Sequence, residues 1–307
     1  MGSLSITVAL VLASLPQQLD PVTVGAHGVL TTLEASTTTG WQLAAEVEQQ
    51  VSTLAERGLD GVLLERHLAD PSFAASTHRD ELTRQVRLSA ETHARRFHVA
   101  WDVRWLSDAD WAARVKEDLS SLRVFESPAY VRESGRPVVL LRGLGASDAP
   151  GTVAETMDLI DWLKDRGFSV VATVPSGWAT GEGTRPNFLS AFARVDAVQV
   201  EAGTIDDAVR ADLAFATQLG LAYQLVLDAP TNAPDAPAAE RFWSQAVVAL
   251  QAGVPVVIAG LPATNGTEPA NTVLLTSAAA RMLQRREVAP LPALLATAAP
   301  LDVPESR

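Results

Sequence analysis

The fold is decided by residues 43–64, which read LAAEVEQQVSTLAERGLDGVLL. Four apolar residues of this stretch recur at helical spacing: Leu43, Val47, Val51 and Leu54. They predict one buried face of a helix that ends at Arg57-Gly58, because glycine commonly follows the last turn of a helix. The run Gly61-Val-Leu-Leu64 follows at once and has the composition of a short buried strand. A helix that leads directly into a strand is typical of parallel α/β proteins.

The same unit of helix, glycine and strand recurs along the chain. Further strands are expected at residues 97–102, 137–141, 168–174, 197–200, 223–227 and 255–259. Further helices are expected at residues 76–96, 107–126 (with Ser107 and Asp110 as a capping pair), 153–166, 186–192, 204–218, 238–252 and 273–286. Adding residues 6–12 as the first strand gives eight units, which predicts a single (β/α)8 barrel domain over residues 1–288 and a tail at 289–307.

An open, doubly wound sheet is the alternative arrangement of such units. That fold usually carries a glycine-rich fingerprint after its first strand, and Pro16-Gln-Gln-Leu-Asp20 contains no glycine. The closed barrel is therefore the favoured prediction.

The composition excludes several classes of protein. Of the 307 residues, 47% are hydrophobic and 20% are charged, which indicates a globular chain with a sizeable core. Lysine and arginine number 24 against 36 acidic residues, and 24 − 36 gives a net charge of −12. Nucleic acid and acidic membrane surfaces are therefore not expected partners. Because the chain has no cysteine, it has no disulfide, thiolate zinc site or thiol nucleophile.

No membrane segment, metal or cofactor is expected. The apolar residues 6–15 are too short to cross a bilayer and lack the basic start of a signal peptide, so we expect a soluble protein of undecided compartment and oligomeric state. His93 and His98 do not have a chelating spacing, and we interpret His67 and His98 as structural. Gly143-Leu-Gly145 lacks the Lys-Ser/Thr of a phosphate-binding loop.

Functional side chains of a (β/α)8 barrel lie at the carboxyl ends of its strands. Four carboxylates at these positions are the catalytic candidates: Asp102, Glu201, Asp228 and Glu268. Seven further residues are candidates for binding a substrate: Glu65, Arg66, Arg104, Trp105, Arg142, Trp178 and Asn265. Carboxylates at one mouth suit acid–base catalysis, and the two tryptophans would offer flat faces to sugar rings. Alternatively, the acids cap helices or pair with neighbouring arginines, as Glu65 with Arg66 and Asp102 with Arg104 suggest.

Seven short motifs follow one another in a recognisable order. They are Gly58-Leu-Asp-Gly-Val-Leu-Leu-Glu-Arg-His67, Ser127-Pro-Ala-Tyr130, Gly135-Arg-Pro-Val-Val139, Gly143-Leu-Gly145, Leu159-Ile-Asp-Trp-Leu163, Val174-Pro-Ser-Gly-Trp178 and Arg241-Phe-Trp243. From about Leu43 to Thr267, the chain resembles the family-99 and family-71 type glycoside hydrolases, including bacterial proteins of the xylosidase or arabinosidase type. The resemblance implies a (β/α)8 barrel of carbohydrate-related ancestry.

The chain departs from this family where the family's catalytic carboxylates would stand. Relatives usually end strand eight with a segment of the type Asp-Glu-x-x-Glu-Gly-Thr, whereas the matching stretch here is Leu261-Pro-Ala-Thr-Asn-Gly-Thr267, with Glu268 just beyond it. Loss of a carboxylate from a two-carboxylate site costs several orders of magnitude in rate. The resemblance therefore implies a site that has lost its usual catalytic acids.

Three functions remain open from the sequence. The first is a barrel without glycosidase activity that binds carbohydrate or serves as a scaffold. The second is an active hydrolase with relocated carboxylates, which requires two of them about 5 to 5.5 Å apart for a retaining reaction or about 6.5 to 9.5 Å apart for an inverting one. The third is a barrel that grips an anionic small molecule with Arg66, Arg104 and Arg142.

Overall fold

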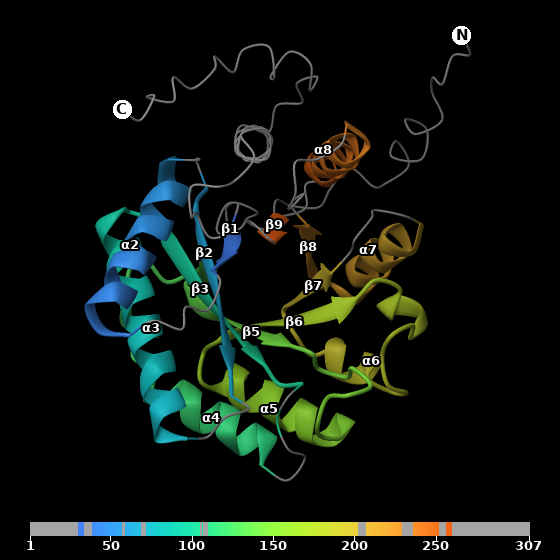
Figure 1. The fold of residues 1–307 in the computed structure, drawn as a ribbon. Coiled ribbons are helices and arrows are strands. Elements are labelled where there is room, and N and C mark those ends of the chain that lie inside the picture. The colour runs from blue at the N-terminus through green and yellow to red at the C-terminus, as the bar shows by residue number, and fades with distance from the viewer. Residues whose placement is uncertain are drawn as a thin grey trace.

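The computed structural model describes residues 30–33, 39–56, 59–68, 72–104, 106, 110–201, 207–228, 236–251 and 256–259. Eight strands within these residues run parallel around one ring (Figure 1). They are β1 (Leu30–Leu33), β2 (Gly61–His67), β3 (Arg96–Asp102), β5 (Arg136–Arg142), β6 (Ser169–Pro175), β7 (Ala197–Glu201), β8 (Ala222–Asp228) and β9 (Val256–Ala259). Their hydrogen-bonded order is β3-β2-β1-β9-β8-β7-β6-β5, and a further pairing of β3 with β5 closes the ring. The prediction of a (β/α)8 barrel is confirmed, and the open sheet is excluded.

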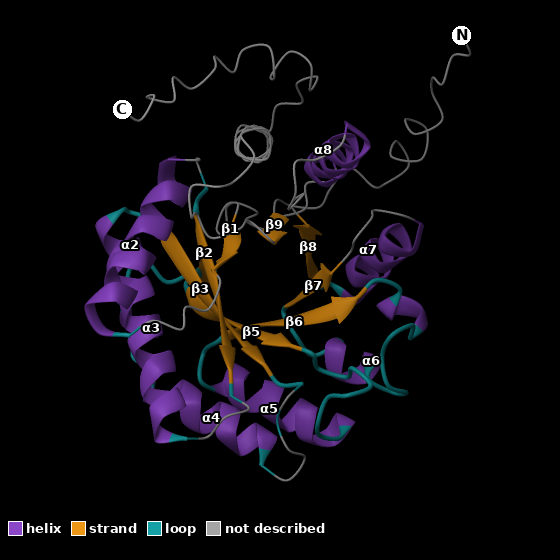
Figure 2. Cartoon of the chain, in the orientation of Figure 1, coloured by secondary structure: helices purple, strands orange, loops and turns teal. Residues whose placement is uncertain are grey.

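Helices surround the ring on its outside (Figure 2). They are α2 (Gly40–Glu56), α3 (Phe73–Thr92), α4 (Trp111–Ser121), α5 (Val153–Asp165), α6 (Leu189–Phe192), α7 (Asp207–Leu219) and α8 (Ala236–Gln251). Two single turns of 3-10 helix, η1 (Val124–Glu126) and η2 (Trp178–Thr180), and the short strand β4 (Arg132–Glu133), antiparallel to β5, complete the described elements. None of the helices described is long and apolar enough to cross a membrane.

Two local predictions need correction. The first place in the ring, which we assigned to residues 6–12, is held by β1, because Leu30–Leu33 pairs in parallel with both β2 and β9. The helix expected from Ser107 begins instead at Trp111, with Asp110 at the N-cap and no hydrogen bond from its side chain. Residues 6–12, Ser107, the helix expected at 273–286 and the tail at 289–307 all lie outside the described residues.

The strand pleat separates two sets of side chains. One buried cluster contains residues of five ring strands and no helix residue, and it fills the barrel interior: Leu63, Ala100, Leu140, Val171 and Ala197 are among its members. The predicted apolar face of α2 is buried in the other cluster, which lies between the ring and the helices. Because successive side chains of a strand point to opposite sides, Leu63, Glu65 and His67 share the inner side of β2, and Arg66 faces the helices.

Arg66 joins the ring to two helices through a buried network. Its guanidinium is only 1% exposed and holds Asp118 of α4 with two hydrogen bonds, from Nε at 2.9 Å and from Nη2 at 2.6 Å. The same guanidinium donates to Asp80 at 2.8 Å and to Thr83 at 2.6 Å, both on α3. The indole of Trp101 on β3 donates to Asp118 at 2.7 Å. This network therefore stabilises the packing of α3 and α4 on β2 and β3.

We expect Asp118→Ala to lower the free energy of unfolding by about 3 kcal/mol, because it leaves a buried guanidinium without its forked partner. Urea unfolding at pH 7 measures the change. Arg84→Ala, which removes the exposed Arg84–Glu81 pair on α3, is the control and should cost less than about 1 kcal/mol. Equal effects of the two substitutions would contradict the structural role of the network.

Candidate ligand site at the barrel mouth

Three ring strands are joined at their carboxyl ends by one guanidinium. Arg142, the last residue of β5, donates from Nη1 to Glu65 Oε1 on β2 and from Nη2 to Glu201 Oε1 at the end of β7. The Arg142 side chain is 19% exposed and that of Glu201 is 39% exposed, so the group lies at the opening of the barrel rather than deep within it. The two carboxylates therefore face each other across Arg142.

A second carboxylate and arginine pair lies beside the first. The Asp102 side chain is fully buried at the end of β3, and both of its oxygens accept hydrogen bonds from Arg104, at 3.0 Å from Nε and 2.6 Å from Nη2. Asp102 Oδ1 also accepts the backbone N–H of Arg104 at 3.1 Å. The hydrogen bonds to Asp102 raise the pKa of the Arg104 guanidinium; burial opposes this, and the charges of Asp102, Glu201 and Asp148 reinforce it. Arg104 is therefore a fixed cation already engaged by Asp102.

Gly143 leaves room for the Arg104 side chain beside the loop that follows β5. Gly143 follows β5 with φ +81°, a left-handed conformation that favours glycine. A Cβ built at Gly143 would overlap Cγ of Arg104. The side chain of Arg104 therefore lies directly against the backbone of the loop that follows β5.

His67 completes the group on the β2 side. Strand register places His67 opposite Asp102, and Asp102 opposite Arg142. His67 Nε2 is 3.7 Å from Glu65 Oε2, and His67 Nδ1 is 3.8 Å from Asp102 Oδ2. These distances permit ion pairing but are too long for hydrogen bonds.

The sequence favours a structural role for His67, but its ring is 48% exposed at the mouth. The period-two spacing of Glu65 and His67 on a strand was the signal that could have placed them together.

The six residues form what we call the mouth cluster: Glu65, His67, Asp102, Arg104, Arg142 and Glu201. Three carboxylates and two guanidiniums give 2 − 3, a formal charge of −1 with His67 neutral. Each arginine of the cluster is already paired with a carboxylate. The mouth cluster is therefore poorly suited to an anion and well supplied with hydrogen-bonding groups.

Among the residues that the structure describes, no group of three or more His, Cys, Asp or Glu is arranged to hold a metal ion.

Two predicted binding residues do not reach the mouth. Arg66 faces the helix layer, because it alternates with Glu65 and His67 along β2. Trp178 is fully buried, with ring centroids 6.0 Å from Phe192 and 5.3 Å from Phe215. Neither side chain can contact a ligand in the barrel opening, so both assignments are corrected.

Asp212 explains why Trp178 points into the helix layer. This buried carboxylate on α7 accepts the backbone N–H of Gly177 at 2.7 Å and that of Ala179 at 2.9 Å. Gly177 itself has φ +84°. The loop after β6 is therefore held in a left-handed turn that directs Trp178 between α6 and α7 instead of into the opening.

The remaining candidates lie at or beyond the limit of the described residues. Asp228 ends β8, where the backbone pairs with Ala259 of β9, but its side chain is not among those described. Trp105, Asn265 and Glu268 lie outside the described residues, as does the stretch 261–267, where the sequence resemblance implies the loss of catalytic acids. Their roles stay predictions.

Comparison with known proteins supports the fold alone. No family model matches the chain, and no relative was found among curated proteins. Similar solved structures include a candidate α-L-fucosidase from Bacteroides thetaiotaomicron, 14% identical over 79% of this chain and 90% of that one, with a TM-score of 0.51. A GH5 cellulase from an Icelandic hot spring isolate is 11% identical over 85% of this chain and 89% of that one, with a TM-score of 0.49. The N-acetylneuraminate lyase from Fusobacterium nucleatum is 11% identical over 88% of this chain and 78% of that one, again with a TM-score of 0.49.

The likeness is one of fold. A likeness at 14% identity shows a shared fold and does not select a reaction. Function has to be argued from the mouth cluster itself.

We expect Gly143→Ala to lower the free energy of unfolding by about 2 to 4 kcal/mol, because it adds backbone strain and overlaps Arg104. Gly167→Ala is the matched control: Gly167 has φ +80° and nothing within 4 Å of a built Cβ, so strain alone should cost about 1 kcal/mol. Thermal and urea unfolding of both variants measure the difference. Equal costs would show that Arg104 does not lie against Gly143.

Proposed function

We propose that the chain binds a neutral carbohydrate at its barrel mouth and does not hydrolyse it. The observation that carries this proposal is the bridge from Arg142 to both Glu65 and Glu201. It leaves the cluster with planar hydrogen-bonding groups whose charges are largely compensated. The resemblance to family-99 and family-71 type glycoside hydrolases supports a carbohydrate ligand, and the departure at residues 261–267 supports the loss of hydrolysis.

Carboxylates held by an arginine are well suited to hydroxyl groups. Each carboxylate oxygen can accept two hydrogen bonds, so Glu65 and Glu201 keep accepting capacity after pairing with Arg142. A few fixed polar groups in a concave opening typically orient a small ligand. Neighbouring hydroxyls of a sugar ring can donate to these oxygens without bringing a charge of their own.

The same pairing argues against proton donation. A general acid has to carry a proton near neutral pH, whereas a guanidinium pairs with an ionised carboxylate. Asp102 is engaged by Arg104 through both oxygens, and Glu65 and Glu201 share Arg142. The described carboxylates of the mouth are therefore arranged to accept hydrogen bonds from a ligand.

One observation keeps a hydrolase as the second candidate. Because Glu65 and Glu201 bond to two nitrogens of one guanidinium, the bonded oxygens lie within about 8 Å of each other, the sum of two hydrogen bonds and the guanidinium width. Separations of this order occur in glycoside hydrolases.

The structure makes an anionic ligand less favourable than the sequence alone indicated. Arg66 faces the helix layer, and Arg104 and Arg142 are already paired with carboxylates.

We expect calorimetry at pH 7.5 to detect at least one neutral sugar from a panel of D-xylose, L-arabinose, D-glucose and D-mannose. Arg142→Met should weaken that binding about tenfold, or 1.4 kcal/mol, because Glu65 and Glu201 lose their common partner. Arg84→Met, on the exposed face of α3, is the control and should leave the affinity unchanged. Binding of citrate or phosphate without binding of any sugar would favour the anionic alternative.

Hydrolysis is tested in parallel with the p-nitrophenyl glycosides of the same four sugars. We expect no release of p-nitrophenol above the uncatalysed rate. Release that is abolished by Glu201→Gln would overturn the proposed lack of catalysis and support the hydrolase.

A further inference from the structure

His67 stands between two carboxylates that already have arginine partners. His67 faces Glu65 on β2 and Asp102 at the end of β3. Asp102 is paired with Arg104 just beyond β3, and Glu65 is paired with Arg142 of β5, which also binds Glu201 of β7. The ring nitrogens of His67 lie 3.7 Å from Glu65 Oε2 and 3.8 Å from Asp102 Oδ2. The ring is 48% exposed, so it can exchange a proton with solvent directly.

The two carboxylates differ in what they can still accept. Both oxygens of Asp102 are occupied by the Arg104 side chain. In Glu65, Oε1 is taken by Arg142, whereas Oε2 has no hydrogen bond from any residue that the structure describes and points to His67. Glu65 Oε2 is therefore a mouth oxygen that either a ligand hydroxyl or a protonated His67 can engage.

We propose that protonation of His67 closes this site to its ligand. Histidine is the side chain that ordinarily changes charge between pH 5 and 8. As an imidazolium it donates from both ring nitrogens, and a small rotation brings it within hydrogen-bond distance of Glu65 Oε2. With a neutral His67, whose Nε2 lies 3.7 Å from Glu65 Oε2, that oxygen stays open to a hydroxyl of the carbohydrate. The inference rests on the proposed function and adds its regulation by pH.

The direction of the pH effect follows from competition for one oxygen. The ligand binds the form with neutral His67, so binding and protonation exclude each other. The affinity is full above the range in which His67 takes up its proton and falls as the pH decreases through that range. We expect the dissociation constant at pH 5.0 to exceed that at pH 7.5 about tenfold.

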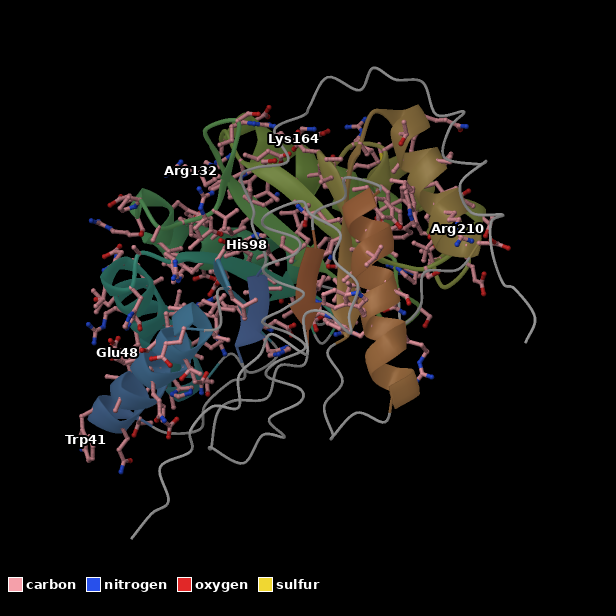
Figure 3. All side chains as sticks on the ribbon, turned by 90° about the horizontal axis from the view of Figure 1, so that it is seen from above. Trp41, Glu48, His98, Arg132, Lys164 and Arg210 are labelled. Atoms are coloured by element: carbon pink, nitrogen blue, oxygen red, sulfur yellow. The ribbon has the colours of Figure 1, made fainter. Side chains whose placement is uncertain are left out.

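Calorimetry with the four sugars of the panel at pH 7.5 and 5.0 tests the inference on the full chain. His67→Gln keeps a planar hydrogen-bonding group without a titrating charge, so its affinity should not change between the two pH values. His67→Arg fixes a positive charge and should bind weakly at both. His93→Gln is the matched control: His93 pairs with Glu48 at 2.6 Å, and Glu48 lies on the outer helix α2 (Figure 3). Its pH dependence should equal that of the unmodified chain.

The outcomes separate the two proposals. Sugar binding with equal affinity at both pH values, or a pH dependence that survives in His67→Gln, would overturn the role of His67 and leave carbohydrate binding intact. The absence of sugar binding at both pH values would overturn the proposed function and the regulation with it.

Discussion

Side-chain alternation around a closed ring is the constraint on which the rest of this structure depends. The pairing of β3 with β5 closes the barrel, so every strand has an inner side and a helix side. On β2 the same pleat sends Glu65 and His67 to the mouth and Arg66 to Asp118 in the helix layer. Three consecutive residues thus serve two purposes: the middle one fixes the packing of α3 and α4, and its neighbours form the candidate site.

Much of the fold could be predicted from the sequence because apolar periodicity reports burial directly. The face of α2 and the middle strands of the ring follow this signal. The first strand could not be predicted in this way. β1 is a four-residue strand that reads LTTL, and its two threonines give it a weak apolar signal. The longer apolar run at 6–12 has a stronger strand composition. A short strand that is held by neighbours on both sides does not need a strong signal of its own.

The candidate site was harder to predict, since it depends on direction as well as position. Glu65, Asp102, Arg142 and Glu201 follow from the rule that functional groups lie at strand ends. Trp178 follows a strand end too, yet a turn held by Asp212 buries it. That interaction joins residues 35 positions apart and leaves no local pattern. For His67, the spacing of two residues from Glu65 indicates a shared side of β2, but the approach to Asp102 depends on strand register, which a single sequence does not show.

The central claim is that Arg142 and its carboxylates act as one unit, and a double-mutant cycle tests it most directly. Unfolding free energies would be measured for the unmodified chain, Arg142→Ala, Glu65→Ala and the combined variant. The account predicts that the two single effects fail to add, with a coupling of about 1 kcal/mol. Effects that add to within about 0.3 kcal/mol would show that Arg142 does not hold Glu65 and would contradict the account.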